Sequence, residues 1–277
     1  MSTRRFRQVD VFTAQPYLGN PVAVVLDGDG LTSAEMQRIA QWTNLSETTF
    51  VVSPTDPTAD YGLRIFTATE ELPFAGHPTL GSCHAWLDAG GIAHDPDEIV
   101  QECGVGLVRI RRDGLRRAFA APPMLRSGPL DRATLDAACT AIGIDGSRVV
   151  DSAWIDNGPG WLGLLLPSAE EVLALRCAPT PLKIGVAGPH PVGHETALEV
   201  RAFYPTGDVT FEDPVTGSLN ASMAQWLVAA RHIALPYTAS QGAAMGRAGR
   251  IRLDGDADGT IWVGGEAVVC ISGTIET

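Results

Sequence analysis

The sequence is short of positive charge. Its 277 residues include 20 Lys and Arg against 32 Asp and Glu, which gives a formal net charge of −12 at pH 7. A protein that binds nucleic acid must neutralise backbone phosphates, mostly with Lys and Arg. The charge balance therefore argues against a nucleic-acid partner.

Cysteines are few, and long apolar runs are missing. The five cysteines show no C-x-x-C spacing and their number is odd, so we expect reduced thiols in a cytoplasmic protein rather than a disulfide framework. Strongly apolar runs such as residues 161–166 are far too short to span a bilayer. No apolar segment follows the basic start of the chain, so we expect neither a signal peptide nor a membrane partner.

Apolar residues make up 45% of the chain, enough for one large core or two medium ones. Thr32 and Glu35 form a capping box that predicts a helix to about residue 42, and Gly143 ends a second predicted helix from residue 131. The other expected elements are strands at residues 10–12, 21–26, 47–52, 61–67, 250–253, 261–263 and 267–271, and helices at 78–87, from 168, and at 218–232.

Residues 254–259 copy the start of a calcium-binding EF-hand loop. The twelfth position of that loop, a bidentate Glu in a calcium site, is Gly265 here, and strand-like runs flank the segment. We therefore expect a hairpin turn and no metal site.

The two halves of the chain resemble each other. A shift of 137 residues places Asn20 on Asn157, Arg64 on Arg201, Phe66 on Phe203, Phe74 on Phe211 and Thr79 on Thr216. The shared register predicts two copies of one unit. Two such domains facing each other would form a cleft, where small molecules tend to bind.

Two loops that lead into predicted helices lie at related positions of this repeat. Residues 73–79 read Pro-Phe-Ala-Gly-His-Pro-Thr, and residues 211–218 read Phe-Glu-Asp-Pro-Val-Thr-Gly-Ser. The first N–H groups of a helix lack intrahelical partners and attract anions, so each loop is suited to hold a small carboxylate. Gly76 and Gly217 would let the ligand approach the backbone.

A purely structural reading of these residues stays open. His77 and Asp213 could simply cap the two helices, with Thr216 and Ser218, because Asp, Thr and Ser are favoured caps. Glu47, at a strand entry among Ser and Thr residues, could be an exposed side chain without a role.

Seven motifs are spread from about Val9 to Ile275. They are Asp-Val-Phe-Thr at 10–13, Gly-Asn-Pro-Val-Ala-Val-Val at 19–25, Met-Gln-Arg-Ile-Ala at 36–40, Asn-Leu-Ser-Glu-Thr-Thr-Phe at 44–50, Leu-Pro-Phe-Ala-Gly-His-Pro-Thr at 72–79, Glu-Asp-Pro-Val-Thr-Gly-Ser at 212–218 and Gln-Gly-Ala-Ala-Met-Gly-Arg at 241–247. The motifs are specific in combination. Through them the chain resembles the phenazine-biosynthesis isomerase family, the PhzF-like proteins.

The resemblance implies a fold. The family shares the α+β fold of diaminopimelate epimerase, in which two pseudo-symmetric domains each wrap a curled, mostly antiparallel, barrel-like sheet around a central helix. We expect the first domain at residues 1–120, joined by a C-terminal strand at 268–277, and the second at 130–267. The Pro-rich residues 121–129 would link them. The resemblance also implies a homodimer.

The resemblance further implies a site and a reaction. Glu47 would be the general acid/base, His77, Asp213 and Ser218 would contact a small carboxylate substrate, and Gly76 and Gly217 would offer N–H groups to its carboxylate. The reference substrate is trans-2,3-dihydro-3-hydroxyanthranilate, on which a proton moves between ring carbons and the double bonds shift. Such a reaction needs no metal, nicotinamide or pyridoxal cofactor.

Two alternatives stay open beside this isomerase. One is an epimerase or racemase of an amino-acid-like substrate, and the other is a non-catalytic relative that binds a small anion. Related epimerases use two cysteines at the helix termini, where this chain has His77 and Asp213, so a one-carboxylate proton shift fits better. Leu219, Asn220 and Ala248 depart from the family pattern and leave the substrate open.

Overall fold

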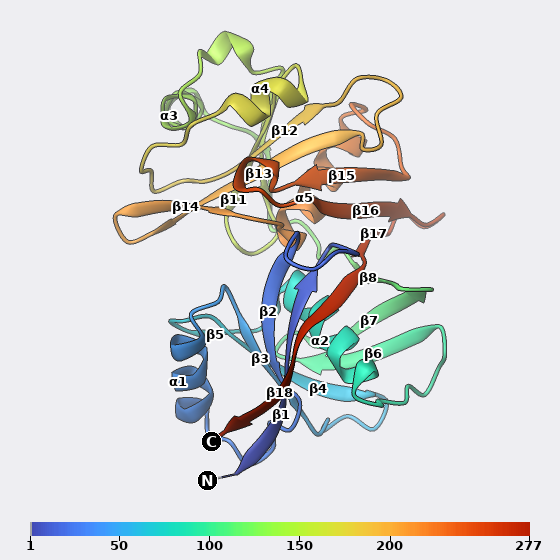
Figure 1. Cartoon of the computed structure of the whole chain (residues 1–277). Coiled ribbons are helices and arrows are strands. Elements are labelled where there is room, and N and C mark those ends of the chain that lie inside the picture. The colour runs from blue at the N-terminus through green and yellow to red at the C-terminus, as the bar shows by residue number, and fades with distance from the viewer. Residues whose placement is uncertain (1) are drawn as a thin grey trace. The chain divides into compact units, whose positions relative to one another are not determined.

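The computed structural model describes residues 2–277 and divides them into two compact units. Unit 1 holds the described residues up to Ala120 together with Gly264–Thr277, and unit 2 is Ala121–Val263. The C-terminal strand β18 (Ala267–Glu276, red in Figure 1) lies beside β1 (Thr3–Val11, dark blue) and so belongs to unit 1. No helix among residues 2–277 is both long enough and apolar enough to cross a membrane.

Unit 1 forms one sheet with two helices. Besides β1 and β18, its elements are β2 (Asn20–Val25), α1 (Ser33–Thr43), β3 (Thr48–Val52), β4 (Tyr61–Phe66), β5 (Glu71–Leu72), α2 (Gly76–Asp88), β6 (Glu98–Cys103), β7 (Gly106–Asp113) and β8 (Arg116–Ala120). The strand order is β18-β1-β2-β3-β4-β6-β7-β8, and β5 also pairs with β4. The pairs β2·β3 and β4·β6 are parallel, and the others are antiparallel.

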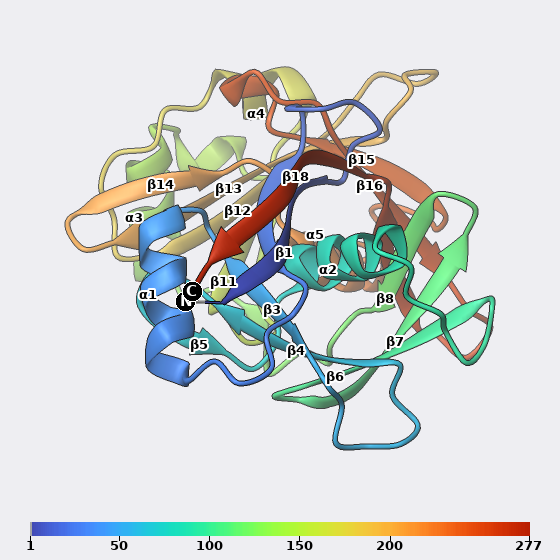
Figure 2. The ribbon, with the colours of Figure 1, turned by 60° about the horizontal axis from the view of Figure 1, so that its bottom comes forward.

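The sheet of unit 1 curls around α2. This helix contacts strands from both ends of the strand order, β18 and β1 at one end and β8 at the other (Figure 2). The approach is close, because a Cβ on Gly81 would lie 2.4 Å from Val22 Cγ1. On the opposite face of the sheet, α1 buries Met36 and Ala40 against Phe50 and Phe66.

Unit 2 repeats this plan. Its elements are β9 (Arg126–Pro129), α3 (Arg132–Ile142), a 3₁₀ turn (Gly146–Arg148), β10 (Asp151–Asp156), β11 (Trp161–Leu165), α4 (Ala169–Ala174), β12 (Lys183–Pro189), β13 (Leu198–Thr206), β14 (Val209–Asp213), α5 (Gly217–Ala229), β15 (Tyr237–Gln241), a second 3₁₀ turn (Ala243–Met245), β16 (Gly249–Gly255) and the first three residues of β17 (Ile261–Gly265), whose last two belong to unit 1. The order is β9-β10-β11-β12-β13-β15-β16, with β14 also on β13. The parallel pairs are β11·β12 and β13·β15.

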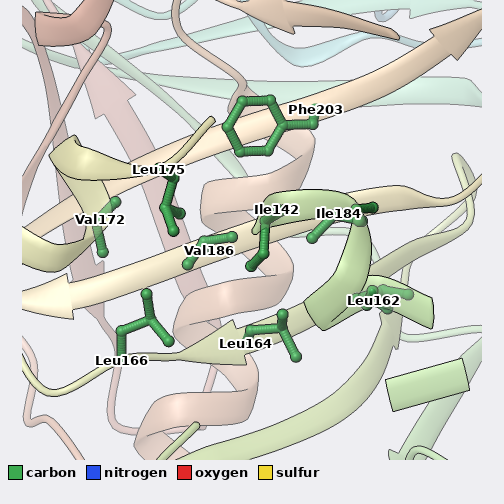
Figure 3. Close-up of a cluster of buried hydrophobic side chains, with 11 residues drawn as sticks. Ile142, Leu162, Leu164, Leu166, Val172, Leu175, Ile184, Val186 and Phe203 are labelled. Carbon is green, nitrogen blue, oxygen red and sulfur yellow. The ribbon is translucent and has the colours of Figure 1, made fainter. Parts of the chain in front are cut away.

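The central helix of unit 2 is α5, and it also lies close to its sheet. Leu219 is fully buried, and a Cβ on Gly185 of β12 would lie 2.2 Å from its Cδ1. The opposite face of the sheet is covered by α3 and α4, which bury Ile142 and Val172 against Leu164, Val186 and their neighbours (Figure 3). Strands that lie between a central helix and the outer helices are buried on two faces, which accounts for the apolar sequences of β2 and β11.

Most of the elements expected from the sequence are present. The α+β architecture with a central helix in each unit is confirmed. Thr32 and Glu35 form the expected capping box of α1, and Gly143 ends α3 in the left-handed conformation. The expected hairpin turn is confirmed: residues 256–260 connect β16 to β17, and the N–H of Asp256 donates to the carbonyl of Thr260 at 2.9 Å. Residues 121–129, expected to be a linker, include β9, which pairs with β10.

A cluster of one arginine, one glutamate and one phenylalanine repeats in the two units. Arg64 binds Glu71 through two hydrogen bonds and lies 5.1 Å from the ring of Phe66. At the equivalent place, Arg201 binds Glu212 through two hydrogen bonds and lies 4.9 Å from the ring of Phe203. The duplicated side-chain arrangement supports the internal repeat read from the sequence.

The single offset of 137 residues is wrong beyond β13. Phe66 pairs with Glu71 across the β4–β5 hairpin, whereas Phe203 pairs with Glu212, so the hairpin of unit 2 is longer by four residues. Gly76 and Gly217, the first residues of α2 and α5, are consequently 141 positions apart. The equivalent of His77 is thus Ser218, and the matches of Phe74 with Phe211 and of Thr79 with Thr216 are coincidental.

The repeated cluster gives a matched stability test. The side chains of Arg201 and Glu212 are 6% and 14% exposed, while those of Arg64 and Glu71 are 29% and 41% exposed. Arg201→Met leaves a nearly buried carboxylate unpaired, so we expect it to lower the free energy of unfolding of unit 2 by about 3–5 kcal/mol. Arg64→Met should cost unit 1 about 1 kcal/mol or less. Urea denaturation of both variants measures this, and equal losses would contradict the prediction.

Candidate functional site

Glu47 lies in the short segment between α1 and β3, directly before the strand begins. Asn44 ends α1 in the left-handed conformation, and the carbonyl of Glu47 accepts the N–H of Ala23 on the neighbouring strand β2 at 3.4 Å. Thr48 and Thr49, which follow, are fully buried. The side chain of Glu47 is only 15% exposed, so the reading of an ordinary surface glutamate is wrong.

His77 meets Glu47 from the first turn of α2. Its side chain is 7% exposed, and its Nε2 lies 3.3 Å from Oε2 of Glu47. The curled sheet brings the start of β3 to the N-terminus of the helix it encloses. Two residues thirty positions apart in the sequence are therefore in direct polar contact.

The contact joins a carboxyl group to a neutral imidazole. The distance alone would suit an ion pair, but burial lowers the pKa of His77 to about 3. The ring is consequently uncharged above that pH. The contact is therefore one between an uncharged ring and a carboxyl group, because desolvation of the 7% exposed imidazole outweighs the other effects on its pKa.

The proton of this neutral ring can be placed. The ring also makes a hydrogen bond to the backbone of Pro21, which raises the pKa of His77 but by less than burial lowers it. A bond that raises the pKa of an imidazole is one in which the ring donates, here to the carbonyl oxygen of Pro21. Nε2 has no hydrogen-bond partner among residues 2–277, so Nδ1 is the donor. Nε2 then presents a lone pair toward Glu47.

Side chains do not cap α2. Its N-cap residue is Ala75, and the described residues provide no side-chain cap to the helix. The N–H groups of Gly76 and His77 lie in the first turn of the helix, where no carbonyl of the helix can accept them, and Pro78 has no N–H group. The capping role considered for His77 is therefore wrong, and the helix start remains suited to an anion.

Gly76 is required by packing. A Cβ at this position would lie 2.5 Å from Cζ of Phe119, whose ring fills the space. The expectation that the missing side chain admits a ligand is wrong on this side of the backbone. Gly76 can therefore contribute to ligand binding through its N–H group and not through space beside its Cα.

Asp213 ends β14 in unit 2 and contacts the next loop. Its Oδ2 accepts the hydroxyl of Thr216 at 2.5 Å. Thr216 is the N-cap of α5, yet its hydroxyl caps no N–H group among the residues described. Asp213 and Thr216 therefore bind each other, and the N–H groups of Gly217 and Ser218 are left at the helix start.

Ser218 is fixed by Asn157, which follows β10, and by Trp161, the first residue of β11. Its Oγ accepts Nε1–H of Trp161 at 3.1 Å, and its carbonyl accepts Nδ2–H of Asn157 at 2.9 Å. Oδ1 of Asn157 is buried and has no hydrogen-bond partner in the described part of the chain. The sequence reading missed both residues, although the match of Asn20 with Asn157 pointed to that segment.

Leu219 and Asn220 point into unit 2. Leu219 fills the space above Gly185, and Nδ2 of Asn220 donates to the carbonyl of Thr216 at 2.9 Å and to Oε1 of Gln241 at 2.8 Å. Both are at most 2% exposed. Their departure from the family pattern therefore concerns the support of the helix start rather than a surface for substrate.

Two cavities of unit 1 lie away from Glu47 and His77. One of about 440 Å³ is lined by Arg64, Glu71, Pro73 and Cys103, and one of about 470 Å³ by Arg5, Tyr61, Trp86 and others. Neither lining includes a residue predicted for the site. Among residues 2–277, no group of three or more His, Cys, Asp or Glu side chains is arranged to hold a metal ion.

Comparison with known proteins decides the family. The family model of phenazine biosynthesis-like proteins, PhzC-PhzF, matches residues 9–273. The chain belongs to this family. The resemblance noted in the sequence is confirmed.

Two curated PhzF relatives cover nearly the whole chain. Antisense-enhancing sequence 1 of Schizosaccharomyces pombe is 38% identical over 297 residues, with 99% of each chain covered. Trans-2,3-dihydro-3-hydroxyanthranilate isomerase of Pseudomonas aeruginosa is 34% identical over 263 residues, which cover 89% of this chain and 88% of the relative. Relatives named as isomerases identify the chain as an isomerase.

Solved structures agree on the fold. A PhzF-family protein of Bacillus anthracis superposes with a TM-score of 0.85 at 22% identity, covering 100% of both chains. A hydroxyproline epimerase of Agrobacterium vitis gives a TM-score of 0.58 at 13% identity, covering 99% of this chain and 92% of that one. The epimerase-like fold expected from the sequence is confirmed.

Within residues 2–277 of this PhzF-family chain, the first turns of α2 and α5 contain no cysteine. Cys83 lies inside α2, is fully buried, and burial raises its pKa to about 12. Such a thiol stays protonated at neutral pH and makes a poor base. The titratable side chains beside α2 and α5 are instead Glu47, His77 and Asp213.

The neutral state of His77 predicts a pH dependence of stability. Its folded pKa of about 3 lies below the unfolded value of about 6.5, so between these values only the unfolded chain binds the proton. The free energy of unfolding of unit 1 should therefore fall by up to about 1.4 kcal/mol per pH unit below pH 6.5 through this residue. It should be unaffected by this residue at higher pH.

Chemical denaturation at pH 7 and pH 5 tests this, with His77→Gln as the variant that cannot titrate. The variant should lose about 2 kcal/mol less than the wild type between pH 7 and pH 5. Identical pH slopes would show that His77 is protonated in the folded protein.

Proposed function

We propose that this PhzF-family isomerase shifts a proton and the associated double bonds on a small cyclic amino- or hydroxy-carboxylate, without a cofactor. The substrate class that fits best is trans-2,3-dihydro-3-hydroxyanthranilate, named for the relative from Pseudomonas aeruginosa. The observation that carries the proposal is the contact of Glu47 with the buried neutral imidazole of His77 beside the uncapped start of α2.

Glu47 is proposed as the acid and base of the reaction. One C–H bond breaks as the carboxylate takes the proton, one C–H bond forms as the same group returns it to another ring carbon, and the double bonds move between them. The substrate gains and loses no electrons overall, so an acid–base group is sufficient. Groups of this kind typically contribute about 10²–10⁴-fold to rate.

His77 is proposed to hold Glu47 and contact the substrate. Because Nδ1 is engaged with Pro21, the ring cannot turn freely, and Nε2 keeps its lone pair toward Glu47. The N–H groups at the start of α2 and the partial positive charge of the helix suit the substrate carboxylate. Anion binding by backbone groups is compatible with a chain whose net charge is −12.

Unit 2 contributes a second set of groups in this proposal. Ser218 and the N–H of Gly217 are assigned to the substrate carboxylate, and Asp213 to a substrate amino or hydroxyl group, since a carboxylate accepts from such donors. The position of Ser218 is set by Trp161, whose indole N–H occupies one lone pair of Oγ and leaves the hydroxyl proton available to a ligand.

Turnover of trans-2,3-dihydro-3-hydroxyanthranilate in D₂O tests the role of Glu47. The wild type should place solvent deuterium on a ring carbon of the product, and Glu47→Gln should lower kcat about 10²–10⁴-fold and abolish incorporation at matched times. Glu199→Gln is the control, because Glu199 is another buried carboxyl group, in unit 2, whose pKa is raised by burial. Deuterium incorporation by Glu47→Gln at the wild-type rate would refute the assignment.

Carboxylate recognition by Ser218 is tested separately. Ser218→Ala should raise KM about tenfold or more with a smaller effect on kcat, since a hydrogen bond to a charged group contributes about 1.5–3 kcal/mol. Ser222→Ala, one turn later in α5, removes a buried hydroxyl that bonds only to the carbonyl of Leu219 and serves as control. A similar rise in KM for both variants would mean that helix stability, not ligand contact, is responsible.

A further inference from the structure

Gln241, at the end of β15, holds the loop that carries Asp213 and Ser218. The residue is 1% exposed, and its carboxamide makes four hydrogen bonds. Oε1 accepts the N–H of Thr216 at 3.0 Å and Nδ2–H of Asn220 at 2.8 Å. Nε2 donates to the carbonyl of Asp213 at 3.0 Å and to Oγ1 of Thr216 at 2.9 Å.

These bonds fix the direction of the Thr216 hydroxyl. Because Nε2–H of Gln241 occupies a lone pair of Oγ1, the hydroxyl proton of Thr216 is directed to the other neighbour, Oδ2 of Asp213, at 2.5 Å. The carboxamide thus orients the Asp213 carboxylate through Thr216, in addition to fixing the Asp213 backbone. Such chains of hydrogen bonds strengthen one another in a buried environment.

The other unit shows that the fold itself does not require this glutamine. In the parallel pairs, Gly62 lies opposite Glu102 and Glu199 lies opposite Ser240, so the residue equivalent to Gln241 in unit 1 is Cys103. A thiol is one weak donor and one weak acceptor and cannot make four such bonds. Unit 1 nevertheless builds the same strand, loop and helix start.

The glycine after this position, Gly242 in unit 2 and Gly104 in unit 1, shows that the end of the strand lies close to the loop backbone in both units. A Cβ on Gly242 would lie 2.6 Å from the carbonyl oxygen of Pro214, and a Cβ on Gly104 would lie 2.7 Å from Cα of Pro73. The strand end therefore contacts the loop in both units, while a carboxamide at this position is specific to unit 2; the buried glutamine of unit 1, Gln101, lies two residues earlier and donates to Thr79 of α2 instead. What Gln241 adds is the orientation of polar groups.

We propose that Gln241 is a positioning residue, which orders Asp213 and the start of α5 for the substrate. The inference rests on the proposed function of Asp213 and Ser218 as substrate contacts. Asn220 belongs to the same arrangement, because it donates to the Oε1 atom that also accepts the N–H of Thr216.

Two variants of Gln241 separate its roles. Gln241→Met removes every hydrogen bond at similar volume, whereas Gln241→Glu keeps the acceptor for Thr216 and Asn220 and loses the N–H donors. Both should raise KM for trans-2,3-dihydro-3-hydroxyanthranilate at least tenfold while kcat changes less than threefold. Ser240→Ala, which alters the buried neighbour on the same strand, should leave both constants within twofold and controls for loss of strand stability.

Amide hydrogen exchange over residues 215–218 provides a readout that needs no turnover. Exchange should be at least tenfold faster in Gln241→Met and close to the wild type in Gln241→Glu and Ser240→Ala. Faster exchange with unchanged KM would overturn the positioning role. Unchanged exchange in Gln241→Met would show that the hydrogen bonds of Gln241 do not order residues 215–218, whatever the turnover.

The two proposals fail in different ways. If the wild type does not convert the substrate but exchange is accelerated in Gln241→Met, the proposed function is refuted and the ordering of the loop by Gln241 stands. If the wild type converts the substrate and neither variant changes KM, the proposed function stands and the positioning role is refuted.

Discussion

The close approach of each central helix to a curled sheet is the constraint on which the rest of the structure depends. Glycines make it possible, since Gly81 faces Val22 in unit 1 and Gly185 faces Leu219 in unit 2. A helix enclosed in this way begins among residues from several strands, so its unpaired N–H groups meet side chains that are distant in the sequence. The contact of His77 with Glu47 is a direct result of that geometry.

The two units use the same geometry for different chemistry. At the equivalent helix position unit 1 has an imidazole and unit 2 has a hydroxyl, His77 and Ser218. In unit 1 a carboxyl group lies beside the imidazole. In unit 2 an indole and an amide, from Trp161 and Asn157, hold Ser218 in place. In the proposed function, proton transfer and positioning are therefore divided between two copies of one supersecondary unit.

Local signals in the sequence predicted the elements well because they act over a few residues. The capping box at Thr32 and the left-handed Gly143 are of this kind. The repeat was visible through Arg64 and Arg201. A fixed offset of 137 residues cannot account for the longer hairpin of unit 2, so it does not align His77 with its equivalent, Ser218. The roles of Gln241, Asn157 and Trp161 depend on contacts across the fold, for which a single sequence offers no periodicity or spacing.

The match of Leu219 with Gly185 has a consequence for how this enzyme can diversify. A smaller residue at 219 would leave a void above the strand, and any side chain at 185 would collide with the leucine. The packing of α5 on β12 can therefore change only when the helix residue and the strand residue are substituted together, as a linked pair.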